Sequence, residues 1–158
     1  MNSKVTKEVK NLIKILNLNC NCKIEEFKDE VNWNYISAHQ KLSENFIREF
    51  KDYVDWDLIS TFQKLSEDFI REFQNNVDWD LISYSQKLSE NFIREFQDKV
   101  HWAGISHSQK LSENFIEEFK DKVEWVNISQ YQNLSKKFIA KFIDMISFYL
   151  SKIIRKFY

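Results

Sequence analysis

The chain has almost no glycine or proline. Its 158 residues include one glycine and no proline. Tight turns, β-hairpins and phosphate-binding loops depend on these two residues, so their scarcity argues against an all-β fold and against a nucleotide-binding α/β fold. Helices joined by short polar corners need neither residue. The composition therefore predicts an all-α protein.

Cysteines and long apolar runs are also scarce. The two cysteines, Cys20 and Cys22, are too close together for ordinary disulfide geometry and have no second pair of zinc ligands nearby. We expect reduced thiols, as in an intracellular protein. No stretch approaches the roughly 18 apolar residues of a transmembrane helix, and the N-terminal residues lack the apolar core of a signal peptide.

Neither charge sign dominates, because 23 basic residues face 24 acidic ones. A nearly neutral chain has no overall field that would attract nucleic acid. Hydrophobic residues make up 43% of the chain and aromatic residues 16%, which is too much for a disordered protein. These values indicate a folded protein with a sizeable core.

The sequence contains a repeat of 23 residues. Five tryptophans mark it: Trp33, Trp56, Trp79, Trp102 and Trp125. Counting the tryptophan as position 0, the unit reads W-x-x-I-S-x-x-Q-x-L-S-x-x-F-I-x-x-F-x-x-x-V-x. Short repeats of this kind indicate a solenoid, in which each unit is stable only when it stacks on the next.

One continuous helix cannot carry this repeat. At about 100° per residue, 23 residues leave the next tryptophan about 140° away around the helix. We therefore predict two short helices per unit, for example roughly 56–64 and 66–76. Asn32, Asp55 and Asp78 are expected to cap first helices. A serine is expected to cap each second helix, in the set Ser43, Ser66, Ser89, Ser112 and Ser135.

The predicted fold is an all-α solenoid of two-helix hairpins with a capping element at each end. Residues 1–32 form an N-terminal cap with a decayed unit, in which Phe27 and Val31 keep the phase of the repeat. Residues 33–147 form five units and residues 148–158 a C-terminal capping helix, all in one continuous domain. The five tryptophans are predicted to be buried in equivalent core positions.

The stretch WDLISYSQKLSENFIREFQDKV (residues 79–100) resembles short tandem helical repeats in proteins of giant DNA viruses that infect amoebae. The shared motif is W-x-x-I-S-x-x-Q-x-L-S-E-x-F-I-x-E-F, and the resemblance covers about residues 24–143. His101, Glu124 and Lys136 depart from it. The resemblance implies a viral origin, a location in the host-cell cytoplasm and a scaffold without enzymatic activity.

Nothing in the sequence indicates catalysis, and no cofactor is expected. The histidines His39, His101 and His107 lack partners at metal-ligand spacing, so no metal site is predicted. The recurring serines have no histidine in register. The recurring carboxylates are expected to lie on a solvated helix surface, although a ligand groove is the alternative.

The residues that differ between units point to a partner-binding face. If positions 0, 3, 4 and 7 of the first helix face inward, positions 1, 2, 5 and 6 face outward. Stacked variable positions of this kind are how solenoids bind protein partners. The candidate residues are Tyr35, His39, Leu58, Phe62, Leu81, Tyr84, His107 and Tyr131. The alternative is that the residues on this side vary without functional constraint and that the aromatic ones pack between units.

The basic C-terminal segment carries a second hypothesis. From Lys136 onward it holds six basic residues and one acidic residue on an amphipathic pattern. Such a helix can bind an anionic membrane surface. Nucleic acid is the weaker alternative, because the repeats are acidic and would repel phosphates. Phe148, Ile154 and Tyr158 lie off the stripe and suggest self-association. We expect it to cap the last unit, and the partner of the scaffold to be a host protein or another viral protein.

Overall fold

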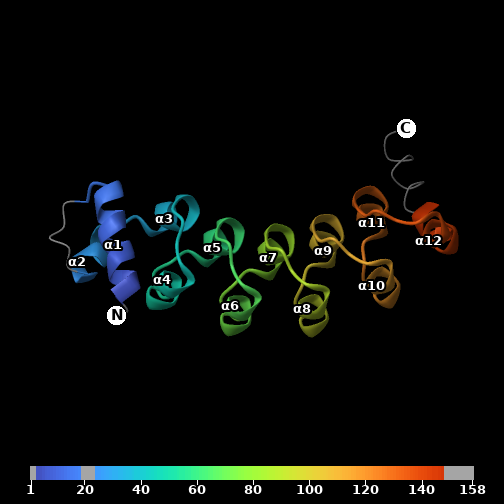
Figure 1. Ribbon diagram of the computed structural model, residues 1–158, viewed down its shortest axis with the longest axis horizontal. Helices are drawn as coiled ribbons and strands as arrows, with labels where there is room; N and C mark the ends of the chain where they lie inside the picture. Colours follow the sequence, from blue (N-terminus) through green and yellow to red (C-terminus); the bar gives the residue numbers. More distant parts are fainter. Residues whose placement is uncertain (1–2, 19–23, 148–158) are drawn as a thin grey trace. The chain divides into compact units, whose positions relative to one another are not determined.

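The computed structural model describes residues 3–18 and 24–147, and every regular element in those ranges is an α-helix. Two helices precede the repeats, and each 23-residue unit then forms one pair of short helices (Figure 1). The helices are α1 (Ser3–Ile15), α2 (Ile24–Glu30), α3 (Trp33–His39), α4 (Glu44–Glu49), α5 (Trp56–Phe62), α6 (Glu67–Glu72), α7 (Trp79–Ser85), α8 (Glu90–Glu95), α9 (Trp102–Ser108), α10 (Glu113–Glu118), α11 (Trp125–Tyr131) and α12 (Lys136–Lys141). The predicted all-α solenoid of two-helix repeats is confirmed.

The chain divides into two compact units, residues 1–78 and residues 79–158. In the first, α3 and α5 pack against each other, and α1 packs on α4 and on α2. In the second, α9 packs against both α7 and α11. Figure 1 shows that within each of these parts the first helices of the hairpins form one layer and the second helices α4 and α6, or α8 and α10, form another.

Side-chain caps start the helices without glycine or proline. The Asp55 carboxylate accepts a hydrogen bond of 3.0 Å from Leu58 N, and Ser66 Oγ accepts one of 3.2 Å from Phe69 N. His101 caps α9 through Nδ1, which accepts from Gly104 N at 3.2 Å. Glu124 makes no side-chain cap at α11, as its departure from the motif suggested.

The second helices are shorter than predicted. Helix α6 ends at Glu72, whereas the sequence indicated helix as far as about residue 76. Beyond it, the backbone turns tightly, with Asn76 N and Val77 N both donating to Phe73 O at 2.9 and 3.1 Å. This turn closes the unit and places Val77 in the core.

The core consists of the isoleucine and phenylalanine positions of the repeat. In the residue 1–78 part, Ile36, Phe46, Ile47, Ile59 and Phe69 are all fully buried. Each first helix contributes its position 3 isoleucine, and the second helices α4, α6, α8 and α10 contribute Phe-Ile at positions 13 and 14. Burying a side chain of this size contributes about 1.5–3 kcal/mol, so this layer supplies most of the driving force for folding.

The prediction that all five tryptophans are buried is wrong. Trp125 is buried, but Trp33, Trp56, Trp79 and Trp102 are only partly covered. The indole N–H makes the same hydrogen bond in the buried Trp125 as in the partly covered Trp33, Trp56 and Trp102, so this bond fixes the place of the ring but not its burial. The N–H donates at 3.0 Å to the backbone carbonyl five residues earlier, as in Trp56 to Lys51 and Trp102 to Gln97. The ring therefore lies at the edge of the hairpin, over the final turn of the preceding unit.

Three of the recurring glutamines at position 7, Gln63, Gln109 and Gln132, each join their unit to the one before it. Gln63 Oε1 accepts from Leu42 N at 3.0 Å, while its Nε2 donates to Ser37 O at 2.7 Å and to Gln40 O at 2.8 Å. Gln109 makes the same three bonds to the corner that follows α7. One side chain thus satisfies the backbone groups of a corner that lacks glycine.

The recurring serine at position 4 and glutamate at position 11 have similar linking roles. The Ser83 hydroxyl accepts from His101 N at 2.9 Å, where the next first helix begins. The Glu90 carboxylate accepts from Ser112 N at 2.6 Å, where the next second helix begins. Both side chains accept hydrogen bonds from backbone N–H groups that would otherwise be unpaired at the start of a helix.

The second-helix layer carries ion pairs between neighbouring units, 24 residues apart. Arg48 Nε lies 2.7 Å from Glu72, and Arg94 Nη2 lies 2.8 Å from Glu118. The hydrogen bond to Glu118 raises the pKa of the Arg94 guanidinium above its ordinary value. In the last such pair the signs are exchanged, because Glu117 holds the arginine position and contacts Lys141.

The N-terminal cap has the predicted partial repeat character. Phe27 and Val31 are buried, in phase with the core positions of later units. Helix α1 supplies the missing link to the first full unit, because the Glu8 carboxylate accepts from Ser43 N at 2.8 Å. Glu8 thereby replaces the position 11 glutamate that a preceding complete unit would provide.

The predicted C-terminal capping helix, 148–158, lies outside the described residues. The hairpin before it has an uncovered side chain at a core position of the repeat. Ile139 is 37% exposed, although Ile116, at the same position one unit earlier, is fully buried. Position 14 is therefore covered by the unit that follows it along the chain.

Candidate functional site

The variable side of the first helices lies mostly on the surface, as predicted. Tyr35, Phe62, Tyr84 and Tyr131 are 44–59% exposed, and His39 and His107 are also exposed. Leu58 and Leu81 are half-buried, and Gly104, at the same position 2, is buried. Position 2 was predicted to face outward. In α9 and α11 it instead lies where the helix packs against the first helix before it, through Gly104 and Asn127, whereas Tyr35 at position 2 of α3 is exposed. We call the exposed side, formed mainly by positions 1, 5 and 6, the open face.

In the residue 79–158 part, the open face carries a row of rings. Tyr84 on α7 lies 6.0 Å from His107 on α9, and His107 lies 4.2 Å from Tyr131 on α11, measured between ring centroids. His101 extends the row, with its ring 5.6 Å from Tyr84. We call Tyr84, His107 and Tyr131 the ring row. It links three consecutive units through side chains that are absent from the repeat motif.

The single glycine of the chain makes room for this row. A Cβ atom at Gly104 would lie 3.0 Å from Cδ2 of Tyr84 and 3.1 Å from Cβ of Ser83. The missing side chain lets the Tyr84 ring lie against α9 and reach His107. Asn127, at the same position in the next unit, donates to Ala103 O at 3.0 Å and so joins α11 to α9.

Next to the ring row are two lysines of the corners that follow the first helices. Lys87 and Lys110, both at position 8, line a hollow of about 310 Å³ together with Leu88, Ser108 and Gln109. Ser108 Oγ lies 3.1 Å from His107 Nδ1, so the hollow borders the ring row. Both lysine side chains are exposed.

These lysines differ from the cations of the second-helix layer that form ion pairs. Over residues 3–18 and 24–147, no ion pair or hydrogen bond involves the ammonium group of Lys41, Lys64, Lys87 or Lys110. By contrast, Arg48, Arg94, Lys122 and Lys141 are paired with carboxylates. The position 8 lysines are therefore available to an anionic partner.

The residue 1–78 part has a smaller set of rings on its open face. Tyr35 and His39 lie on the same helix, with their rings 5.0 Å apart. Phe62 is the most exposed large apolar side chain of the repeats, at 59%. The structure therefore brings Tyr35 together with His39 and joins Tyr84, His107 and Tyr131. Leu58 and Leu81 are half-buried and belong to neither set.

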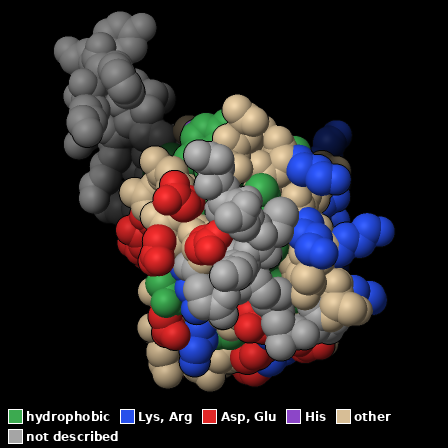
Figure 2. Space-filling model, turned by 90° about the vertical axis from the view of Figure 1, so that its left-hand side faces the viewer, with side chains coloured by type: hydrophobic (Ala, Val, Ile, Leu, Met, Phe, Trp, Pro, Cys, Tyr) green, Lys and Arg blue, Asp and Glu red, His purple; other side chains and the backbone are tan. Residues whose placement is uncertain are grey.

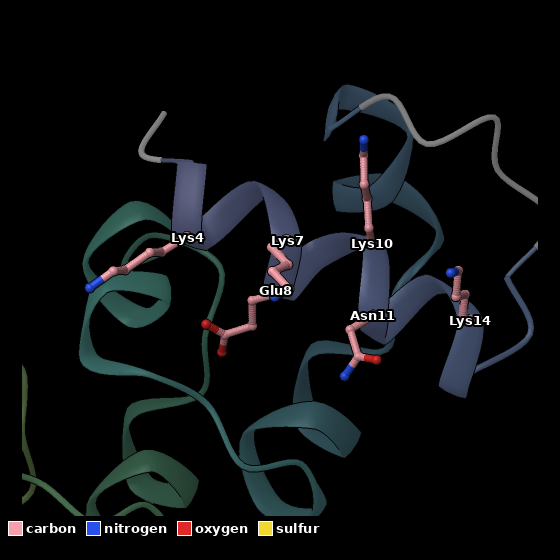
Figure 3. A pocket seen from close by; sticks show the side chains of 6 residues that line it. All are labelled: Lys4, Lys7, Glu8, Lys10, Asn11 and Lys14. Atoms are coloured by element: carbon pink, nitrogen blue, oxygen red, sulfur yellow. The ribbon is translucent and has the colours of Figure 1, made fainter.

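Helix α1 carries a hollow of about 620 Å³, but its lining residues do not converge. Lys4, Lys7, Lys10 and Lys14 are spread along a single helix, while Glu8 points toward the neighbouring hairpin (Figure 3). Figure 2 shows basic side chains gathered toward one side of this end face and acidic ones toward the other. The apolar face of α1 is buried in the fold, so it cannot insert into a lipid surface.

The part of the chain that the structure describes contains no cluster of three or more histidine, cysteine or acidic side chains able to hold a metal ion. Among the described helices, none is long and apolar enough to cross a membrane. His39, His101 and His107 are accounted for by ring contacts and, for His101, by the cap of α9.

Sequence reasoning missed the position 8 lysines. They recur in four of the five units, and the search for binding residues was confined to positions that vary between units. Ion pairs of the second-helix layer join residues 24 positions apart. The position 8 lysines have no oppositely charged residue at that spacing, and this difference could have identified them from the sequence.

Comparisons with protein-family models, curated proteins and solved structures found no match to this chain.

Proposed function

We propose that this protein is a non-enzymatic scaffold that binds a protein partner through the open face of its first helices. The observation that carries the proposal is the ring row, in which Tyr84, His107 and Tyr131 from three successive units form one exposed aromatic strip. Tyrosine is enriched at the centres of protein interfaces because it buries a large area and retains a polar end.

The contrast between the two helix layers supports this choice of face. Second-helix side chains at the surface are largely tied to neighbouring units, as in the Arg94–Glu118 pair. The ring row makes no hydrogen bond to another unit among the described contacts. A partner could therefore cover the rings without breaking the bonds that hold the solenoid together.

The resemblance to the tandem helical repeats of giant DNA viruses of amoebae supports a related proposal about origin. We infer that this chain belongs with those proteins and acts in the host-cell cytoplasm, with a host protein or another viral protein as its partner. The repeated motif and its two-helix fold carry this inference.

Site-specific cross-linking tests the proposed face. A photoreactive amino acid is placed at Ser85, beside the ring row, or at Asn114, on the second-helix side, and each protein is irradiated in amoeba lysate. We expect a discrete partner to be captured from position 85 and not from position 114. The capture should be lost when Tyr131→Ala is added. Equal capture from both positions would contradict the proposal.

A further inference from the structure

The ring row and the position 8 lysines lie on one surface. Ser108 connects them, because it lines the hollow between Lys87 and Lys110 and its hydroxyl lies 3.1 Å from the His107 ring. We call this combined surface, Tyr84, His107, Tyr131, Lys87 and Lys110, the ring–lysine face. It offers exposed rings and two cations within three consecutive units.

The charge of this face differs from that of the neighbouring stretches that contain α8 and α10. Its first-helix and corner stretches, 79–88 and 102–111, contain Lys87, Lys110 and a single acidic residue, Asp80. The intervening stretches, 89–100 and 112–124, contain twice as many acidic as basic residues. The stretches that contain α7 and α9 are therefore slightly cationic, and the stretches that contain α8 and α10 are acidic.

Resting on the proposed function, we infer that the ring–lysine face binds an extended acidic segment of a protein partner, in which carboxylates alternate with aromatic or apolar side chains. The carboxylates pair with the two free ammonium groups, and the apolar side chains cover the rings. Ammonium groups without an internal partner add attraction to a carboxylate at no cost in broken ion pairs.

A single-stranded nucleic acid fits this face less well. The rings contact one another at 4.2 and 6.0 Å between centroids and are tilted by 56° in both pairs, so they leave no slot for a base between them. A continuous row of phosphates would also run past the acidic second-helix stretches. A short acidic peptide meets only the local cationic field, because charges more than about 10 Å away are largely screened at physiological salt.

Fluorescence anisotropy with the full-length protein tests this inference. The probe is a fluorescein-labelled random copolymer of glutamate and tyrosine, and the comparison probes are polyglutamate, a lysine–tyrosine copolymer and an oligothymidylate. We expect the glutamate–tyrosine copolymer to bind most tightly, and its affinity to fall as the salt concentration rises from about 50 to about 300 mM.

Matched variants locate the binding. K87Q/K110Q should weaken binding of the glutamate–tyrosine copolymer by about fivefold, which corresponds to two exposed charge pairs. The control K120Q/K136Q removes the same charge from the second-helix side and should change affinity by less than about twofold. Tyr131→Leu should also weaken binding, and circular dichroism at 222 nm confirms that every variant remains folded.

Two results would overturn the inference. One is an equal loss of affinity in K87Q/K110Q and K120Q/K136Q, and the other is tighter binding of the oligothymidylate than of the glutamate–tyrosine copolymer. If either occurs while cross-linking still captures a partner from position 85, the proposed scaffold function stands and only the acidic nature of its partner is refuted. If position 85 captures no partner but the copolymer binds as expected, the face recognises acidic peptides and the proposed scaffold function fails.

Discussion

The position 7 glutamines allow the link between units to be measured one side chain at a time. Gln109 is 5% exposed and makes three hydrogen bonds to the corner after α7, from Leu88 N and to the carbonyls of Ser83 and Gln86. Replacing it with alanine leaves one backbone donor and two backbone acceptors with fewer partners. An unsatisfied buried group costs about 1–3 kcal/mol, and the carbonyls retain other lone pairs, so Gln109→Ala should lower the free energy of unfolding by about 2–4 kcal/mol.

Gln40 provides the matched control. It occupies the same position in the first full unit, where no earlier full unit precedes it. Among the described contacts its side chain makes no hydrogen bond. Gln40→Ala should therefore change the free energy of unfolding by less than about 0.5 kcal/mol, as expected of an ordinary surface substitution. Urea titration followed by circular dichroism measures both variants.

Gln109→Glu keeps the side-chain volume that Gln109→Ala removes and takes away only the amide donor, so it separates the two effects. The new side chain can still accept from Leu88 N, but a carboxylate oxygen would face the carbonyls of Ser83 and Gln86. This arrangement raises the pKa of the introduced carboxyl in the folded state above its ordinary value of about 4.3. The folded state then binds a proton more readily than the unfolded state, so the variant should gain stability as pH falls and lose it as pH rises. Equal stability of Gln109→Ala and Gln40→Ala would contradict the linking role of Gln109.

Three further predictions concern the packing between units. In a double-mutant cycle on Arg48 and Glu72, R48E and E72R should each be destabilising and the combined variant should recover part of the loss. The coupling should be about 0.2–1 kcal/mol and should shrink at high salt, and zero coupling at low salt would contradict the pair. Trp102→Phe should cost about 1 kcal/mol through the lost indole hydrogen bond, measured by urea titration, and no cost would show that the bond is unimportant. Deleting one whole unit, 79–101, should leave a folded helical protein by circular dichroism, whereas deleting 20 residues from the same place should not, and equal behaviour would refute the 23-residue register.

Much of this fold follows from the spacing of the residues. The 23-residue period, the two helices per unit, the serine caps and the Phe-Ile core positions could all be predicted, because each depends on residues within a few turns of one another. The position of the indole rings could not, because each N–H donates to a backbone carbonyl that becomes available only once the preceding turn has formed. For Trp102 that carbonyl belongs to Gln97.

The linking roles of polar residues were beyond sequence reasoning for a similar reason. Ser83 appeared suited only to close packing, yet it accepts from His101 N, 18 residues further on. The candidate site was predicted in part. Tyr84, His107 and Tyr131 were selected because they vary between units, and the structure brings them into one row. Leu81 was selected on the same ground, but its side chain is half-buried.

The exchanged ion pair explains why surface side chains of the first-helix layer can be substituted more freely than those of the second-helix layer. Glu117 and Lys141 occupy the places that Arg94 and Glu118 occupy one unit earlier, with opposite signs. A charge on the second-helix layer is therefore matched by its neighbour, and changing one member of a pair leaves the other without a partner. Positions 5 and 6 of the first helices carry no such matched pairs among the described residues. A new side chain there alters the surface without disturbing the contacts between units, so this layer can acquire affinity for a partner at little cost in stability.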